Sequence, residues 1–510
     1  MHENPLRAEH ESLEGYLQSV LAPDQLERIL FTNFNHWIFA QGALADSALT
    51  LNTMGSDVLL AFWASKTPML DIAWSTSPAF ASIFRAPSRE HGIQRALIRG
   101  GIPESNLIGP PIRNWKPRGE LLIPEVLTRT NIRKLRYRGA DLGRAILQVH
   151  PTTETPLTDQ FLWPRKWVTK AARSFAYVFD QTLEVIQKRE VSAVAVYNGR
   201  FLHDRAAAAA ALSVGVPTLS YDLGGLDTDF DLTIDETHDW DALQVRMLQM
   251  YDSWDPNERD ELGSKWFLQR TQHLDPMNKL FVESQEIGKT IELPTDRKTV
   301  VYFSSSGDEI AELDLNWDDF FGGQENALRM LAQQCKAKGY FLVVRSHPHK
   351  RKKPKHDVAQ WMAAINEINP DVHLDPFADV DSYTLMRQAD IIATYGSTTG
   401  VEAAYAGKPV IVMGPSAYDK LGTAVGVANS NELAVALDGI QPGSWGGAVS
   451  YGLMMMRRGF IYARVQRTAS ETLCIGGVTI NDSNQIVRNL SHLKGRIQRW
   501  QLLQGDWGQK

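Results

Sequence analysis

Two short apolar runs with a helical string between them constrain the fold of this chain more than any other feature. The runs are ADIIATY (389–395) and PVIVM (409–413), and both are rich in β-branched residues. Such runs are typical of strands that are buried in a parallel sheet. The string between them, VEAAYA (401–406), favours a helix. The segment therefore predicts a strand, a tight turn and a helix that leads into the next strand.

The same alternation of strand and helix patterns recurs in two series. In the first series we expect helices at 17–30, 38–51, 170–189 and 203–215, and strands at 57–64, 191–199 and 218–223. In the second series we expect strands that begin at 298, 340, 372, 389 and 409, and helices at 325–339, 357–368 and 382–389. This pattern predicts an α/β protein with two Rossmann-like domains, whose ligands bind in a cleft beside the carboxyl ends of the strands.

The sequence between and after these two series is helical. Residues from about 239 to 290 are charged and helical in pattern, and NQIVRNLSHLKGRIQRWQLLQ near the C-terminus forms an amphipathic helical pattern. We therefore expect a Rossmann-like domain at 1–238, a helical connection at 239–297, a second Rossmann-like domain at 298–470 and a helical tail at 471–510.

Composition narrows the class of protein. The 510 residues are 43% hydrophobic and 22% charged, with a net charge of −6 that argues against general affinity for nucleic acid. The chain has two cysteines, which cannot form a disulfide framework or a metal cluster. No run approaches the ~18 apolar residues of a membrane span, and the polar N-terminus does not resemble a signal peptide. We expect a cytoplasmic protein.

Three polar segments of the second series follow strands and should face one cleft. They are FSSSGDE (303–309), RSHPH (345–349) and GSTTGVE (396–402). Hydroxyls, backbone N–H groups and cations suit a phosphate, and a carboxylate suits a ribose diol. We therefore predict a nucleotide-sugar site that needs no metal or other cofactor. Its candidate residues are Ser305, Ser306, Asp308, Glu309, Arg345, His347, Pro348, Ser397, Thr398, Thr399 and Glu402. Taken singly, each segment also fits a packed turn, a helix cap or a strand end.

The segments RSHP (345–348) and DPFADVDSYTLMRQADIIATYGSTTGVEAAYAGKPVIV (375–412) resemble the C-terminal domain of GT-B-fold glycosyltransferases that build bacterial surface polysaccharides. They are most similar to capsule polysaccharide biosynthesis proteins, including Kdo and sialic acid transferases. The resemblance covers about residues 298–415, and more weakly 197–218. It implies two domains that face a cleft, a nucleotide-activated donor (a CMP-sugar is favoured), a glycan or lipid-linked glycan acceptor, and a last helix that packs back on the N-terminal domain.

The resemblance also implies roles for individual residues. His347 and Pro348 would contact the nucleotide and its phosphate, Ser397 to Thr399 would bind the phosphate, and Glu402 would contact the ribose. On the N-terminal side, it supports Asn198 and Arg200 in YNGRFLHDR (197–205) as acceptor-binding residues, with Arg205 on the following helix.

Sugar transfer with inversion needs a general base, which is most often Asp, Glu or His. The candidates are Asp204, Asp222 and His203, which lie at or just after predicted strand ends. His203 and Asp204 also fit a simple helix cap. The D-x-D pattern at 227–229 is common by chance, and we do not expect it to bind a metal.

Other functions stay open at this level. A UDP-sugar epimerase, a CDP-polyol phosphotransferase and a non-catalytic nucleotide- or glycan-binding relative all fit similar patterns. The basic run HKRKKPKH (349–356) fits a solvated loop, or a peripheral contact with an anionic acceptor or with the inner face of the membrane. We expect the solvated loop.

Overall fold

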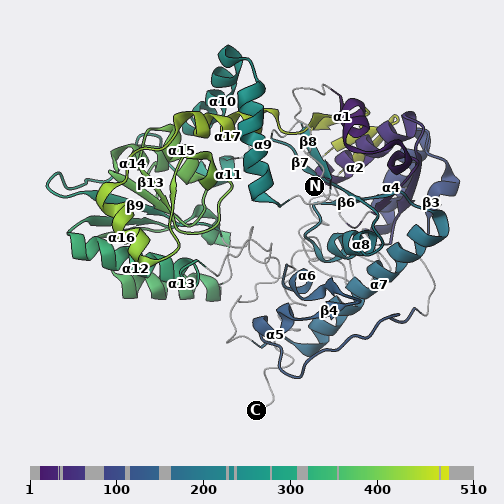
Figure 1. Cartoon of the computed structure of the whole chain (residues 1–510), viewed down its shortest axis with the longest axis horizontal. Helices are drawn as coiled ribbons and strands as arrows, with labels where there is room; N and C mark the ends of the chain where they lie inside the picture. The colour runs from purple at the N-terminus through teal and green to yellow at the C-terminus, as the bar shows by residue number, and fades with distance from the viewer. Residues whose placement is uncertain are drawn as a thin grey trace. The chain divides into compact units, whose positions relative to one another are not determined.

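The computed structural model of the chain divides into two compact units, which are described separately (Figure 1). Unit 1 comprises residues 1–224, 228–237 and 458–510, and unit 2 comprises 225–227 and 238–457. The structure describes residues 12–32, 34, 38–63, 86–109, 115–148, 162–225, 229–234, 238–275, 278–306, 320–352, 355–469 and 472–481.

The core of unit 1 is a seven-stranded sheet with the order β15-β8-β7-β6-β1-β2-β3. The strands β1, β2, β3, β6 and β7 run parallel, whereas β8 and β15 are antiparallel to their neighbours. The bounds are β1 Arg28–Thr32, β2 Asp57–Ala61, β3 Leu107–Ile108, β6 Ala193–Tyr197, β7 Thr218–Leu223, β8 Asp229–Ile234 and β15 Phe460–Ile461. A short hairpin, β4 Arg136–Tyr137 with β5 Ala140–Asp141, lies outside this sheet.

Helices cover both faces of this sheet. Leu30 of β1 packs into a cluster with α6, α7 and α8, whereas Ile29 and Phe31 pack on the opposite face with α1, α2 and α4. This alternation follows from the two-residue period of a strand. The bounds are α1 Leu13–Val20, α2 Ile38–Thr53, α4 Ala86–Arg99, α5 Arg129–Arg133, α6 Leu142–Gln148, α7 Arg165–Arg189 and α8 Leu202–Leu212.

The helix that we expected at 17–30 is wrong over its second half. Helix α1 ends at Val20, Pro23 begins a short 3-10 turn that ends at Leu26, and Arg28 then begins β1. Proline removes a backbone donor and ends a helix, and the apolar run ILF that follows is buried on both faces of the sheet.

The chain also returns to unit 1 earlier than we expected. The second domain was predicted to extend to 470, but unit 2 ends at Arg457, and Phe460 pairs with Phe230 of β8. The start of the predicted helical tail forms strands instead: β16 Val465–Ala469, β17 Thr472–Ile475 and β18 Val478–Asn481 make a small antiparallel sheet in unit 1. Alternating apolar residues around the Gly476–Gly477 turn favour such a hairpin. Residues 482–510, where we predicted the final helix, lie outside the described residues.

The core of unit 2 is a six-stranded parallel sheet with the order β11-β10-β9-β12-β13-β14. Its strands are β9 Thr299–Phe303, β10 Phe341–Arg345, β11 Val372–Leu374, β12 Ile391–Thr394, β13 Val410–Val412 and β14 Val425–Gly426. Its helices include α12 Gln324–Lys338, α13 Lys355–Ile368, α14 Ser382–Gln388, α15 Thr399–Tyr405 and α16 Ser430–Gly439. The two Rossmann-like α/β domains that the sequence predicts are confirmed.

Residues 239–297, which we predicted as a separate connection, belong to unit 2. They form α9 Trp240–Ser253, α10 Pro256–Thr271 and the short α11 Lys279–Val282. Helix α10 packs closely on α17 (Trp445–Arg457), where a Cβ at Gly452 would lie 2.2 Å from the carbonyl oxygen of Gly263. Small residues at this crossing bring the two helix backbones together. Within the described residues, no helix has the length and apolar character of a membrane span.

Candidate functional site

The sheet of unit 2 has a switch point between β9 and β12. From β9 the chain proceeds outward to β10 and β11, and from β12 it proceeds in the other direction to β13 and β14. In open parallel sheets, the loops at the carboxyl ends of such neighbouring strands diverge and leave room for a ligand. The three polar segments predicted from the sequence follow β9, β10 and β12, so the topology brings them to this one edge.

Hydrogen bonds join the loops after these strands. The amide of His347 donates to Ser304 Oγ at 2.8 Å, and Ser305 Oγ donates to the carbonyl of Tyr395 at 2.8 Å. Ser306 Oγ lies 3.3 Å from Nδ1 of His349. The hydroxyls of Ser304 and Ser305 therefore join the loop after β9 to the loops after β10 and β12, whereas the hydroxyl of Ser306 lies beside the His349 imidazole.

The loop after β12 is held in shape by packing. Gly396 has φ = +86°, and a Cβ there would lie 2.0 Å from the carbonyl oxygen of Pro415, so only glycine fits. Ser397 Oγ accepts from the Thr399 amide at 3.3 Å, and Tyr418 donates to the Ser397 carbonyl at 2.6 Å. Thr398 is exposed. The exposed hydroxyl of Thr398 thus lies on a loop whose backbone is held by the close packing of Gly396 and by the hydrogen bond from Tyr418.

His347 has a defined hydrogen-bonding character. Its Nδ1 accepts from the backbone amide of His349 at 3.2 Å, so in the neutral ring the proton lies on Nε2. The ring packs edge-on against Phe281 of α11, with 5.2 Å between centroids. Pro348 begins the 3-10 turn Pro348–Lys352. The Nε2–H group of His347 is therefore a donor, and the His349 amide and the Phe281 ring hold the imidazole in place.

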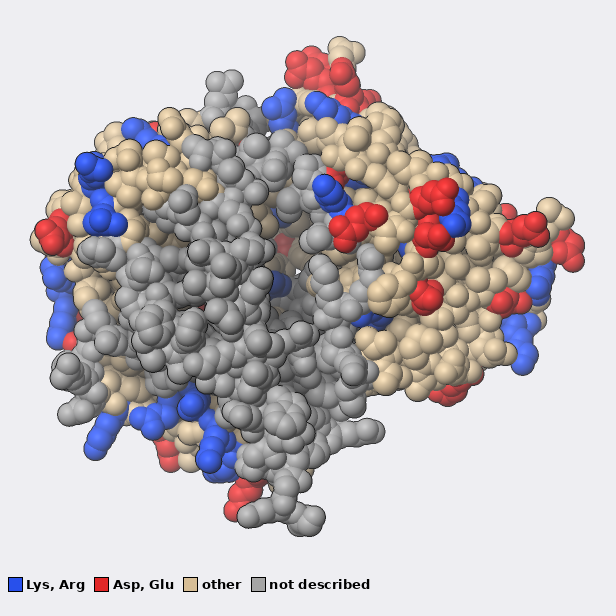
Figure 2. Space-filling model, turned by 180° about the vertical axis from the view of Figure 1, so that it is seen from behind, with Lys and Arg blue, Asp and Glu red and all other residues tan. Residues whose placement is uncertain are grey.

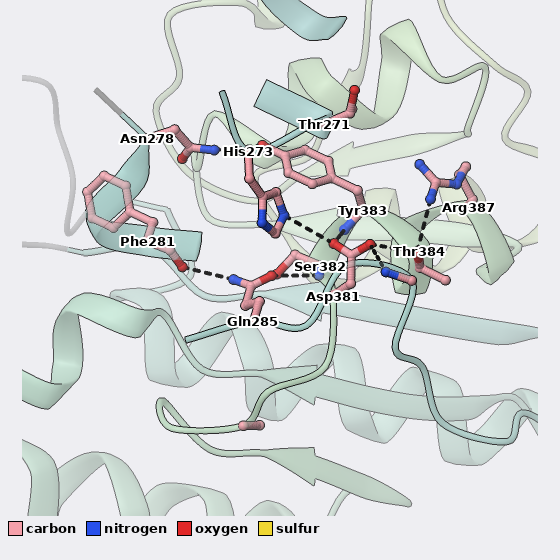
Figure 3. Close-up of polar contacts among 12 residues, drawn as sticks. Thr271, His273, Asn278, Phe281, Gln285, Asp381, Ser382, Tyr383, Thr384 and Arg387 are labelled. Atoms are coloured by element: carbon pink, nitrogen blue, oxygen red, sulfur yellow. Dashed lines mark hydrogen bonds and ion pairs between the residues drawn. The ribbon is translucent and has the colours of Figure 1, made fainter. Parts of the chain in front are cut away.

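The backbone of Phe281 is held by a chain of contacts that Figure 3 shows. Gln285 donates to the carbonyl of Phe281 at 2.8 Å and accepts from the amide of Ser382 at 2.8 Å. Next to Ser382, the carboxylate of Asp381 accepts from Thr384 Oγ1 at 2.6 Å and lies 3.6 Å from Nε2 of His273. This network fastens the segment after α10 to the start of α14.

Arg345 has a structural role in addition to the one that the sequence predicts. Its side chain is buried, and its guanidinium donates to the carbonyls of Asp375 and Ala378 at 3.3 and 3.0 Å. The guanidinium therefore holds the loop after β11, and its contact with phosphate stays a prediction.

Glu402 is buried on α15 and forms an ion pair with Arg270 of α10. The same guanidinium donates to Asp275 at 2.8 Å and to Asn278 at 3.2 Å, and it lies 4.5 Å from the centre of the Trp266 ring. Burial raises the pKa of the Glu402 carboxyl, and the charge of Arg270 opposes that shift. Arg270 could not be predicted from the sequence, because nothing in the helix pattern at 257–272 separates it from a surface arginine.

The other two predicted carboxylates on this side, Asp308 and Glu309, lie outside the described residues. The predicted donor residues that the topology brings to one edge are thus Ser305, Ser306, His347, Pro348 and Ser397 to Thr399, with Glu402 buried behind them on α15.

A second polar group lies at the carboxyl ends of β6 and β7 in unit 1. Asn198 has φ = +57°, its amide donates to the carbonyl of Tyr221 at 2.9 Å, and its side chain donates to the carboxylate of Asp222. Asp222 also accepts from the amide of Leu223 at 2.8 Å. The guanidinium of Arg200 lies 4.8 Å from the centre of the Phe201 ring, and Arg205 is half-buried on α8.

The three candidate bases differ in their surroundings. His203 is fully buried with its ring 5.0 Å from that of Phe34, and Asp204 is buried and accepts from the amide of Tyr197 at 3.2 Å. Only Asp222 is partly exposed. Burial raises the pKa of the Asp222 carboxyl, while the charges of Arg458 and Arg200 lower it. His203 and Asp204 therefore shape the turn after β6, and Asp222 is the accessible carboxylate.

No group of three His, Cys, Asp or Glu side chains that could hold a metal ion occurs among the described residues. The two cysteines, Cys335 and Cys474, are free thiols in different units.

Comparison with known proteins confirms the resemblance seen in the sequence. Residues 279–434, which include all three loops at the switch point, match the family model for capsule polysaccharide biosynthesis proteins. This segment starts at α11 and ends within α16, so it lies entirely within unit 2. No curated protein matches the chain.

Several solved structures are similar to the chain at low sequence identity. The β-Kdo 2,4-transferase of KpsC from Thermosulfurimonas dismutans is 17% identical over 53% of this chain and 85% of that chain, with a TM-score of 0.34. The β-Kdo 2,7-transferase of the same KpsC is 16% identical over 50% and 79%, with a TM-score of 0.30. UDP-GlcNAc 2-epimerase from Neisseria meningitidis is 11% identical over 81% and 90%, with a TM-score of 0.25.

Proposed function

We propose that this protein is a glycosyltransferase that transfers a sugar from a nucleotide-activated donor to a glycan acceptor in bacterial surface polysaccharide assembly. One observation carries the proposal. Loops rich in hydroxyl groups and imidazoles converge at the switch point of a parallel sheet, inside the segment that matches the capsule polysaccharide biosynthesis family. Hydroxyls, amides and a fixed imidazole N–H are the groups that bind a phosphate.

In this proposal the donor phosphate lies against Ser306, His347 and the loop Ser397–Thr399. As the glycosidic bond to the donor breaks, negative charge grows on the leaving phosphate oxygen. Nε2–H of His347 donates to that oxygen, and because the ring is held by the His349 amide and by Phe281, it does not need to reorient during the reaction. The resemblance assigns a ribose contact to Glu402, and its ion pair with Arg270 fixes the carboxylate for that contact.

Asp222 is the base that we propose for the acceptor hydroxyl. The Asn198 amide holds its carboxylate, and partial burial makes it a stronger base than an exposed aspartate. Arg200 and Arg205 follow β6 at the same edge of the sheet of unit 1, where they would contact an anionic acceptor. The reaction as proposed needs no metal and no cofactor.

The donor nucleotide can be identified by thermal unfolding in the presence of CMP, CDP, UDP, GDP and dTDP. A bound ligand raises stability by RT ln(1 + [L]/Kd), so the nucleotide that fits should raise Tm alone among the five. We expect CMP. CDP would point to a polyol-phosphate donor and UDP to an epimerase, and the absence of any shift would refute the proposed site.

Substitution at Thr398 locates the bound nucleotide. Thr398→Val removes one exposed hydroxyl with little change in shape, and Thr290→Val does the same at an exposed threonine outside the three loops. The shift should shrink in Thr398→Val and persist in Thr290→Val. Release of the nucleotide from its activated sugar, on addition of a glycan acceptor, then separates a transferase from a relative that only binds.

A further inference from the structure

One end of unit 1 concentrates positive charge in a chain whose net charge is −6. Residues 115–148 and 162–173 carry twelve Lys and Arg but three Asp and Glu, and four of these cations form ion pairs, with Asp141 (Arg136 and Arg144) or with Asp180 and Glu184 of α7 (Arg138 and Arg118). They form α5, the β4–β5 hairpin, α6 and the start of α7, which lie together in Figure 1. Figure 2 shows Lys and Arg side chains gathered along the lower margin of this unit.

Three large aliphatic side chains are exposed within the same region. Leu122, Val126 and Leu162 are 69%, 54% and 55% exposed. Val126 and Leu162 lie side by side in the backbone, because the residues that follow them are paired: the amide of Trp163 donates to the carbonyl of Leu127 at 2.8 Å. Leu122 lies four residues before Val126 on the same segment. We call these three residues the apolar patch.

Basic residues border the apolar patch. The guanidinium of Arg165 donates to the carbonyls of Pro124 and Ile123 at 2.9 and 3.1 Å, so it lies across the segment that carries Leu122. Asn131 of α5 donates to the carbonyl of Val126 at 3.0 Å, so the basic helix α5 lies next to Val126. Lys116, Lys134 and Lys166 are exposed in the same region.

We propose that this end of unit 1 docks on an anionic lipid surface, with the apolar patch inserted among the acyl chains and the surrounding Lys and Arg at the headgroups. A soluble anionic glycan would use the charges but would leave the three aliphatic side chains in water. An apolar surface on another protein would use the aliphatic side chains but not the excess of positive charge. In a bilayer that contains anionic lipid, the charged headgroups lie at the surface and the acyl chains lie below them. Such a bilayer can bind the Lys and Arg side chains and also bury the apolar patch. This surface is separate from the basic run at 349–356, which lies in unit 2.

The test is sedimentation of the full chain with vesicles of phosphatidylcholine alone or with about 30% phosphatidylglycerol added. We expect binding to the anionic vesicles that falls as salt is raised. Changing Leu122, Val126 and Leu162 together to Ser should weaken binding at least about tenfold. Lys116→Gln, Lys134→Gln and Lys166→Gln should each weaken it by about fivefold.

A matched triple variant controls for a general loss of apolar surface. Leu212→Ser, Val245→Ser and Val435→Ser remove three exposed aliphatic side chains elsewhere, and this variant should bind the vesicles as the unchanged chain does. The proposal is overturned if the unchanged chain does not bind anionic vesicles at low salt. It is also overturned if binding survives the patch substitutions but is lost when Lys350, Arg351 and Lys352 are changed to Gln, or if the patch substitutions instead convert a dimer to a monomer. Nucleotide binding in unit 2 is measured separately, so failure here leaves the proposed transferase activity untouched.

Discussion

At the scale of single residues, the chemistry that we propose depends on how neighbours fix two side chains. His347 carries its proton on Nε2 because a backbone amide occupies Nδ1, and Asp222 keeps its carboxylate in place because Asn198 donates to it. The amide of His349 is two residues from His347, and Asn198 and Asp222 lie at the ends of the neighbouring strands β6 and β7. The two residues therefore make separate predictions for the donor side and for the acceptor side.

Asp222→Asn should abolish most of the transfer activity while the fold is kept. Removal of a general base costs about 10²- to 10⁴-fold in rate. The unchanged enzyme should lose activity as pH falls, with a midpoint above the ordinary value for an aspartate, because burial raises the pKa of this carboxyl and only the ionised form accepts a proton. A pH profile of kcat for both proteins checks this, and an acidic limb that persists in Asp222→Asn would contradict it.

The same carboxyl makes a prediction about stability. Activity should rise as pH rises through the pKa of Asp222, whereas the contribution of Asp222 to stability should fall. A carboxyl whose pKa is raised in the folded state binds more protons when folded, so its contribution to stability falls as pH rises through that pKa. At neutral pH, Asp222→Asn removes this unfavourable term, and Tm should be unchanged or higher. A clear fall in Tm would mean that Asp222 is chiefly a structural residue.

Glu402 makes a stability prediction because it is one half of a buried pair. Glu402→Ala removes one of the two carboxylates that pair with the buried Arg270 guanidinium, and breaking a buried pair typically costs about 3–5 kcal/mol. The combined variant Arg270→Met, Glu402→Leu and Asp275→Asn should be less destabilised than Glu402→Ala alone, because it removes the cation together with both of its carboxylate partners. Urea unfolding of the unchanged chain and the two variants measures this, and a combined variant that loses as much stability as Glu402→Ala, or more, would rule out the coupling.

At the scale of elements, one close backbone contact that shapes unit 2 is the crossing of α10 and α17. A methyl group at Gly452 would lie 2.2 Å from a backbone oxygen, whereas one at Gly446 of the same helix would meet only the Tyr251 hydroxyl at 3.4 Å. Gly452→Ala should therefore destabilise the protein by about 1–3 kcal/mol through overpacking. Gly446→Ala should be neutral or stabilising by up to about 1 kcal/mol, because alanine favours a helix. Equal effects of the two substitutions on thermal unfolding would show that the crossing is not tight.

The strands differ in how well the sequence predicts them. Strands that are buried on both faces and end in a polar turn, such as β9, β10 and β12, carry a strong local signal, so their loops were predicted correctly. Strand β1 was missed because the apolar periodicity of α1 continues into it across Pro23. The β16–β18 sheet was missed because each strand is short and the sheet packs on α2 and α4, which are distant in the sequence.

At the scale of the whole molecule, the least predictable features are contacts between distant parts of the chain. The ion pair of Arg270 with Glu402 joins residues that are 132 positions apart, and the hydrogen bond of Gln285 with Ser382 joins residues 97 positions apart. A single sequence shows the residues but not these partners. For the same reason the sequence does not predict that the Arg345 guanidinium donates to two carbonyls.

The measurement that tests the central claim most directly is calorimetric titration of the best-stabilising nucleotide into three proteins: the unchanged chain, His347→Ala and Asp222→Asn. If the donor site lies at the switch point of unit 2, His347→Ala should weaken binding by about tenfold or more, the loss of a charge-assisted hydrogen bond to phosphate. Asp222→Asn, in the other unit, should bind as the unchanged chain does. Equal affinity of His347→Ala and the unchanged chain would contradict the account, and so would binding that is lost only in Asp222→Asn.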